Sequence, residues 1–282
     1  MKKFPITAYV GAAVLIAASG WSAGAQTLLY QDTFNADGSL GNATELSQLA
    51  GLNASQIAPQ SGGSAEVITG NQLSFTLAGG ATTSEMRFNI AGQLSTGAAP
   101  NLFDWSAGTG GADILAAGGF TVSFDWIAGD TTSGNWIFFT LGNGGDISYS
   151  SLRVLNSTTE GGILLKNSGQ QQIFSGGSQI GSGSYTPSGT SHVVSITYGL
   201  TSWAAGSPVT MSAVVDGNAA GSAAFNLNAT AGQYFDIGTY GNNNNLIDNF
   251  TVTTVPEPSS WAIMAGGFVL LFVARRFRMM QS

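Results

Sequence analysis

Few residues of this chain are of the kind that carry out acid–base catalysis. Glu45, Glu66, Glu85 and Glu160 each stand alone in the sequence. Retaining glycoside hydrolysis needs two carboxyl groups about 5–5.5 Å apart, and no motif here pairs these glutamates. The one histidine, His192, has no serine or carboxylate motif tied to it. The sequence therefore predicts a non-catalytic protein. The alternatives are a secreted glycan-active enzyme with a divergent active site and a purely structural matrix component without a ligand.

Other binding motifs are also missing from the sequence. It contains no zinc motif, no G-x-S-x-G elbow, and no lysine or helix start that would turn its glycines into a phosphate-binding loop. Apart from the two chain ends, its basic residues are Arg87, Arg153 and Lys166, and the formal net charge is −7. An acidic surface repels nucleic acid phosphates and anionic lipids. We therefore expect neither as a partner of that surface.

The N-terminus has the three parts of a secretory signal peptide. Lys2 and Lys3 precede an apolar run over residues 8–18, and Ala23-Gly24-Ala25 forms an A-x-A cleavage site. The sequence therefore predicts a signal peptide over residues 1–25 and an exported protein. Residues 26–254 are then expected to form one domain, which must fold without disulfides because the chain has no cysteine.

The C-terminus carries a second targeting pattern. A Val-Pro-Glu-Pro run at residues 255–258 precedes an apolar stretch, and an arginine cluster follows at once. The stretch at residues 259–274 predicts a single membrane-spanning helix, although it is shorter than the usual length of about 20 residues. Positive charge after such a helix keeps that end in the cytoplasm. The domain is then expected outside the membrane.

This tail, residues 255–280, resembles the PEP-CTERM sorting signal of Gram-negative bacteria. The resemblance implies transient anchoring in the inner membrane and processing by an exosortase, a membrane protease. Release to the cell surface or the extracellular matrix of a biofilm would follow, with exopolysaccharide as a further possible partner. A plain tail anchor is the alternative. The residues of the implied sorting motif are Pro256, Glu257, Pro258, Arg275, Arg276 and Arg278.

The central region predicts short strands between Gly-rich turns. In "GGFTVSFDWIAGD" apolar residues alternate with polar ones from Phe120 to Trp126, which is the period of a strand. "GNWIFFTLGNGG" is a continuous apolar run, typical of a strand buried on both faces. Asp216-Gly217 between two alternating runs predicts a hairpin. Further strands are expected in "AEVITGNQLSFTL", "SLRVLN", "GGILLKN", "HVVSITYGL", "YFDIGTY" and "LIDNFTVTTV", and a short helix at residues 43–54. The predicted fold class is an all-β, antiparallel β-sandwich.

Three segments resemble laminin-G-like and concanavalin A-like jelly rolls. They are "SHVVSITYGL" with "MSAVVDGNAAG", the segment "FDIGTYGNNNNLIDNFTV", and "LYQDTFNADGSLGN" near the start. The resemblance implies a jelly roll in which the first strand pairs with the last. It also gives His192 a structural place on a strand. Ser191 departs from the pattern, because a tryptophan is usual at that position.

The sequence offers two candidate ligand sites, one implied by this resemblance and one suggested by its aromatic residues. Jelly rolls of this kind often hold a structural Ca²⁺ near their first and last strands, which points to Asp32 and Asp248; no other cofactor is expected. For carbohydrate, Trp105 and Trp203 lie in or beside polar, Gly-rich stretches and could stack on sugar rings. The alternatives are that Asp32 caps a turn and that the tryptophans pack in the core.

Overall fold

The structure is a computed structural model. It describes residues 26–34, 38–39, 56–57, 65–76, 83–88, 106, 108–129, 136–143, 157, 159–187, 189–228, 233–240 and 245–256. The chain divides into a unit of residues 27–255 and a second unit of residues 1–26 and 256–282. All the strands and the helix named below belong to the first unit.

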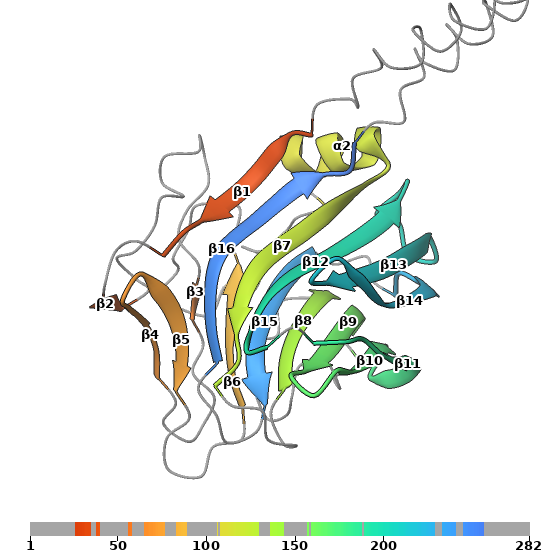
Figure 1. The fold of residues 1–282 in the computed structure, drawn as a ribbon. Coiled ribbons are helices and arrows are strands. Elements are labelled where there is room, and N and C mark those ends of the chain that lie inside the picture. The colour runs from red at the N-terminus through yellow and green to blue at the C-terminus, as the bar shows by residue number, and fades with distance from the viewer. Residues whose placement is uncertain are drawn as a thin grey trace, which may run out of the picture. The chain divides into compact units, whose positions relative to one another are not determined.

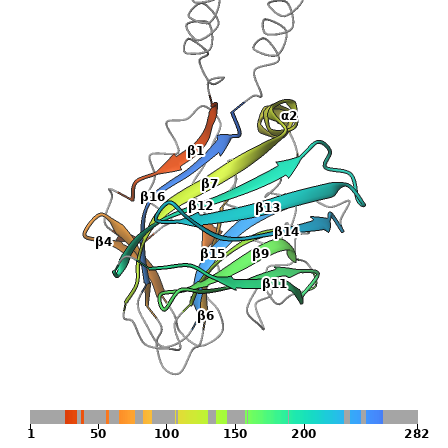
Figure 2. The ribbon, with the colours of Figure 1, turned by 45° about the vertical axis from the view of Figure 1, so that its right-hand side comes forward.

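The described strands form two antiparallel sheets. Sheet A has the order β14-β13-β12-β7-β16-β5-β4-β2, with β1 also paired to β16. Its strands are β1 (Leu28–Asp32), β2 (Gly38–Ser39), β4 (Ala65–Thr69), β5 (Gln72–Thr76), β7 (Gly119–Ile127), β12 (Ser191–Leu200), β13 (Pro208–Val215), β14 (Asn218–Asn226) and β16 (Asn245–Thr254). Figure 2 shows β14, β13, β12, β7 and β16 side by side in one layer.

Sheet B has the order β11-β10-β9-β8-β15-β6-β3. Its strands are β3 (Gln56–Ile57), β6 (Thr83–Phe88), β8 (Trp136–Asn143), β9 (Thr159–Lys166), β10 (Gln170–Ser175), β11 (Ser178–Ser184) and β15 (Gln233–Tyr240). The chain passes from β7 in sheet A to β8 in sheet B, returns at β12, and crosses twice more at β15 and β16 (Figure 1). This is the two-sheet sandwich of a jelly roll, as the sequence predicts.

The core lies between the two sheets. On β7 the side chains from Phe120 to Trp126 alternate between buried and half-buried, with Phe120, Val122, Phe124 and Trp126 facing inward. Strand β8 is buried on both faces from Ile137 to Gly142, as its continuous apolar run predicts. The expected pairing of the first and last strands is also confirmed, because β1 pairs with β16.

The predicted hairpin connects β13 and β14. Asp216 and Gly217 both have positive φ, 52° and 76°, the backbone that a two-residue type I′ turn requires. Asparagine, aspartate and glycine are the residues that adopt it most readily. The Asp-Gly pair therefore fixes the register of the two strands.

The sequence prediction lacks one helix and the strands β2, β3, β6, β10 and β11. Helix α2 (Gly108–Ala117) precedes β7, and its Ile114 is buried in the core. The helix was overlooked because the three glycines of "GTGGADILAA" lower its intrinsic helix propensity. The predicted helix at 43–54, the strand "SLRVLN" and the membrane helix at 259–274 lie outside the described residues. Within the described residues, no helix is long and apolar enough to span a bilayer.

Candidate functional site

The outer face of sheet A carries a row of hydroxyl groups that crosses five strands. The outward side chains of this row are Thr253, Thr121, Thr197, Ser212 and Ser222, on β16, β7, β12, β13 and β14 in turn. Each lies directly opposite the next in the strand register. Because neighbouring strands are about 4.7–4.9 Å apart, the row repeats hydroxyl groups at that interval.

A second row lies beside the first. It consists of Thr251, Ser123 and Ser195, again in register across β16, β7 and β12. Neighbouring hydroxyls touch one another: Ser123 donates to Ser195 over 3.3 Å, and the Thr121 and Thr197 hydroxyl oxygens are 3.0 Å apart. A hydroxyl has one donor and two acceptor positions, so these pairs retain capacity for a further partner. We call the two rows together the hydroxyl face.

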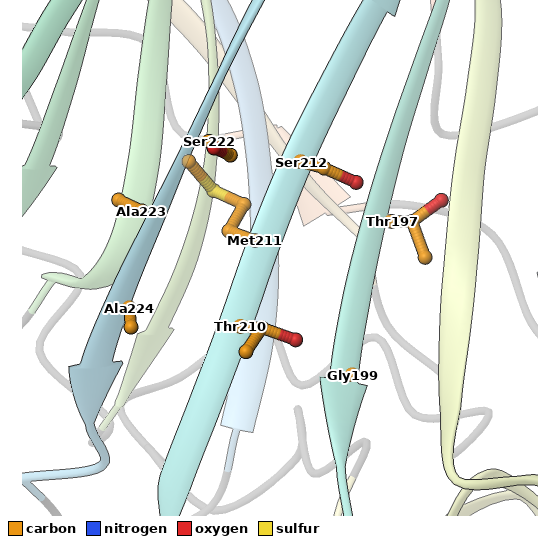
Figure 3. A pocket seen from close by; sticks show the side chains of 8 residues that line it. All are labelled: Thr197, Gly199, Thr210, Met211, Ser212, Ser222, Ala223 and Ala224. Carbon is orange, nitrogen blue, oxygen red and sulfur yellow. The ribbon is translucent and has the colours of Figure 1, made fainter.

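A hollow of about 430 Å³ lies over β12, β13 and β14. Figure 3 shows Thr197, Thr210 and Ser212 on the side of the strands opposite to Met211, which is buried in the core. Gly199 contributes no side chain, and a Cβ there would lie 2.7 Å from the Thr210 Oγ1 atom. Small residues thus create the hollow, which is lined by Thr197, Gly199, Thr210, Met211, Ser212, Ser222, Ala223 and Ala224.

Two carboxylates stand beside the second row. Asp125 on β7 is directly opposite Asp248 on β16, just before a bulge. Asn249, with φ of 51°, donates its side-chain amide to Asp125 over 2.7 Å and its backbone N–H to Asp248 over 2.7 Å. Partial burial raises the pKa of Asp248, the hydrogen bond from Asn249 counteracts part of the rise, and the charge of Asp125 adds to it. The described strands of sheet A contain no lysine or arginine to offset this charge.

His192 is held in a buried cluster beside the turn between β13 and β14. Its side chain is 1% exposed, with Nδ1 2.8 Å from an Asp216 carboxylate oxygen and Nε2 2.5 Å from the Asn167 amide oxygen. The second Asp216 oxygen accepts the backbone N–H of Val193 at 2.9 Å. The cluster thus joins β12, the β13–β14 turn and the turn after β9, which links the two sheets. Such a buried imidazole is well placed to hold the fold together.

Tyr185 completes this cluster. Its ring lies edge-on to His192, with ring centroids 6.4 Å apart, and its hydroxyl donates to the Lys166 carbonyl at 2.6 Å. Burial raises the pKa of Tyr185, and the negative charge of Asp216 raises it further. The phenol therefore stays protonated at neutral pH and serves as a hydrogen-bond donor between turns.

The predicted ligand residues are placed as follows. Trp203 lies half-buried, donates its indole N–H to the Gly111 carbonyl at 3.3 Å, and stacks near Phe120 with ring centroids 6.3 Å apart. Trp105 lies outside the described residues. The backbone of Asp32 pairs with Phe250, next to the bulge that holds Asp248, but its side chain is not among those described. The ligand roles of all three residues, and of Asp248, stay predictions.

Three of the four glutamates considered as catalytic candidates lie on described strands. Glu160 is fully buried and accepts the backbone N–H of Asn228 at 2.5 Å. Glu66 and Glu85 lie on β4 and β6, whereas Glu45 is outside the described residues. In the part of the chain that the structure describes, no three His, Cys, Asp or Glu side chains gather as metal ligands would.

Sequence reasoning missed both the hydroxyl face and the Asp125–Asp248 pair. The alternation of β7 placed Thr121, Ser123 and Asp125 on one face, which was the available signal. Which residues stand beside them depends on the pairing of β7 with β12 and β16. That pairing joins segments far apart in the chain.

The tail has a recognisable counterpart among known proteins. Residues 254–278 match the PEP-CTERM protein-sorting motif. The chain carries a PEP-CTERM sorting signal. The match spans the six residues of the predicted sorting motif, from Pro256 to Arg278. This motif indicates an exported, surface-directed protein and implies processing by an exosortase.

Comparison with curated proteins finds no match, whereas several solved structures are similar to this chain at low sequence identity. The Emp47p carbohydrate recognition domain is 14% identical, with a TM-score of 0.45, and the alignment covers 84% of this chain and all of that domain. A sialidase is 12% identical with the same TM-score; 81% of this chain aligns with 19% of it. An alginate lyase from Pseudomonas aeruginosa is 15% identical, with a TM-score of 0.39, covering 65% of this chain and 83% of the lyase. None of these similarities assigns a ligand or a reaction to this chain.

Proposed function

We propose that the sandwich is a non-catalytic domain that holds a neutral polysaccharide on its hydroxyl face. The observation that carries this proposal is the register of the two hydroxyl rows. A polysaccharide is itself a regular array of hydroxyl groups, and each of its hydroxyls donates and accepts hydrogen bonds. Rows of serine and threonine hydroxyls can satisfy both requirements because their O–H groups rotate.

The short side chains favour binding on a surface this open. Serine and threonine lose little rotamer freedom on binding, so they avoid the entropy cost of about 1.5–2 kcal/mol that ordering a long side chain such as lysine or glutamine incurs. The hollow over Thr197, Thr210 and Ser212 has a volume of about 430 Å³, within the range of about 300–1,000 Å³ typical of small-molecule sites. It is large enough for a sugar unit of a longer chain.

The charges on this face select between classes of polysaccharide. Asp125 and Asp248 border the hydroxyl rows, and the described strands of sheet A hold no basic residue. An anionic polymer such as alginate would meet like charge in that region. The ligand class that fits is therefore an uncharged exopolysaccharide.

Binding is best tested with variants that remove hydroxyls but keep shape. The Thr121→Val, Thr197→Val and Ser212→Ala substitutions, made together, delete three neighbours of the first row. Affinity electrophoresis in gels that contain the neutral exopolysaccharide of the producing bacterium should show retardation of the wild-type protein and loss of it in the triple variant. Ser182→Ala on the exposed strand β11 is the matched control. Equal retardation of the triple variant and the wild type would refute the proposal.

The second candidate function is glycan hydrolysis by the Asp125–Asp248 pair. One observation favours it: the two carboxylates face each other, and the pKa of Asp248 is raised. Glycan hydrolysis needs one carboxyl group that stays protonated as the acid and one that is ionised as the base. Release of reducing ends from the same exopolysaccharide by the wild type, and its loss in Asp125→Asn, would support the enzyme. A rate equal to the uncatalysed one would eliminate it.

We further propose where the chain goes. After removal of residues 1–25, the tail helix at residues 259–274 holds the protein in the inner membrane of a Gram-negative cell. An exosortase then releases the domain to the cell surface or the biofilm matrix. Fractionation and intact mass of the native protein test this. A membrane-bound species that still contains Arg275–Ser282 would leave a tail-anchored protein instead.

A further inference from the structure

The two ends of the sandwich domain are fastened to each other. The backbone N–H of Thr254 donates to the Thr27 carbonyl at 2.9 Å, and the Thr27 N–H donates back to the Thr254 hydroxyl at 2.9 Å. One residue later, the Val255 N–H donates to the Gly119 carbonyl at 3.1 Å. We call these three hydrogen bonds the terminal clamp.

The clamp is built into the packing of the sheet. Thr254 is 3% exposed and lies opposite Phe120 in the register. Gly119 has φ of 147°, and a Cβ there would lie 2.1 Å from the Tyr198 carbonyl oxygen, so no other residue fits this position without displacement. Val255 is half-buried, and Pro256 is exposed.

The clamped segment therefore extends directly to the sorting motif at Pro256. Strand β16 is hydrogen-bonded to β7 on one side and to β1 and β5 on the other, up to its last residue. The PEP triplet starts at Pro256, with no linker residue after Val255. Proline has no N–H to donate to a ladder, which makes Pro256 a natural stop for the strand.

We propose that the terminal clamp sets the upstream limit of tail removal, so that the chain is cut only on the C-terminal side of Val255. This inference rests on the proposed processing by an exosortase. A protease binds its substrate in an extended form, and residues held in β16 cannot enter an active site until the strand leaves the sheet. Every residue withdrawn loses hydrogen bonds and exposes core side chains such as Val252.

The clamp also orders the steps of maturation. Thr27 lies two residues beyond the predicted signal cleavage site, and β1 begins at Leu28. The strand that secures β16 is thus the first segment of the mature chain, so it must be exported and paired before the tail is trimmed. Folding then precedes processing, and a chain cut earlier would lose part of β16.

The clamp can be tested without the exosortase. The full chain in detergent is digested with proteinase K, and the trimmed domain is identified by intact mass. Its C-terminus should be Val255 or a later residue. A wild-type domain that ends at Thr254 or earlier would overturn the inference.

A matched pair of variants tests the hydrogen bonds themselves. Thr254→Val removes the acceptor of the Thr27 N–H and keeps the shape, so trimming into β16 should be about twofold to tenfold faster, the factor expected from one hydrogen bond. Thr201→Val, the same change at an exposed residue just after β12 and outside both the clamp and the hydroxyl face, should trim like the wild type. Equal rates for Thr254→Val and wild type would contradict the role of the clamp.

The same masses from the native host separate the two proposals. A released protein that ends at Val255 or later supports both. An untrimmed native protein, together with the expected proteinase K product, would refute exosortase processing and leave the clamp standing. A released native protein that ends before Val255 would refute the clamp but not the processing.

Discussion

Asp125 and Asp248 face each other across β7 and β16, and the side chain of Asn249 bridges to Asp125 at 2.7 Å. Like charges directly opposite in a sheet are destabilising. The pair therefore costs folding stability at neutral pH. Carboxyl groups with perturbed pKa values cluster at functional sites, and the pKa of Asp248 is raised.

Asp248→Asn is expected to stabilise the protein at pH 7. The variant removes the repulsion yet keeps an oxygen to accept the Asn249 N–H, so the free energy of unfolding should rise by roughly 0.2–1 kcal/mol. The gain should shrink as the pH falls. Because the folded state raises the pKa of Asp248, the wild type takes up this proton more readily when folded, and it regains stability as pH falls toward the usual aspartate value.

Urea unfolding at a series of pH values, in EDTA, measures this effect. Asp113→Asn, at an exposed site on α2, is the control for removing a carboxylate elsewhere. A gain that stays constant from pH 7 down to pH 4 would show that charge repulsion is not its cause.

With calcium present, we expect the wild type to be more stable than Asp248→Asn, the reverse of the order expected in EDTA. A Ca²⁺ ion held by Asp248 with Asp32, as the jelly-roll resemblance implies, would neutralise the repulsion. For a site with a Kd of about 0.1–1 mM, 10 mM CaCl₂ should stabilise the wild type by about 1.4–2.7 kcal/mol and Asp248→Asn far less. Thermal unfolding with CaCl₂ and with MgCl₂ distinguishes the two ions. No shift with CaCl₂ would eliminate the calcium hypothesis.

The buried imidazole gives a second stability prediction. Asp216→Ala leaves the Nδ1 of His192 and the N–H of Val193 without their partner, so we expect a loss of about 1–3 kcal/mol. Asp216→Asn keeps the oxygen that accepts the Val193 N–H and tolerates the positive φ of 52°, so its loss should be smaller. Urea unfolding of both variants decides. Equal losses would show that the carboxylate charge, which both variants lack, matters more than the retained hydrogen bond or the turn conformation.

The fold could be predicted from the sequence further than the site could. Alternation along β7 and the Asp216-Gly217 turn each depend on neighbours in the chain, so local patterns were sufficient. The hydroxyl rows depend on register among five strands, and Thr121 gives no sign that Thr197 and Thr253 will flank it. Helix α2 was missed because its burial against the core, through Ile114, overrides its poor propensity.

Close packing between the sheets leaves no room for a side chain at Gly161, so we expect that only glycine fits there. A Cβ on this residue of β9 would lie 2.2 Å from the ring of Phe225 on β14. Gly161→Ala should therefore cost about 1–3 kcal/mol of stability through overpacking. Gly181→Ala is the control, because its Cβ would be 3.6 Å from Ile173, an ordinary contact.

A double variant isolates the cause. Phe225→Leu removes the ring edge that the new methyl group meets, so Gly161→Ala should cost less in that background than in the wild type. The difference is read from a double-mutant cycle of urea unfolding. Additive losses would mean that Phe225 moves aside freely and that its ring is not the cause of the cost.

Trp203 separates a sugar-stacking role from a structural one. Its indole N–H is used by the Gly111 carbonyl, and its ring packs near Phe120. Trp203→Phe keeps an aromatic ring but loses the hydrogen bond, so the free energy of unfolding should fall by about 0.5–1.5 kcal/mol. Retardation in gels containing the neutral exopolysaccharide should remain unchanged, since the hydroxyl face is intact. Weaker retardation at wild-type stability would instead establish Trp203 as a carbohydrate-binding residue.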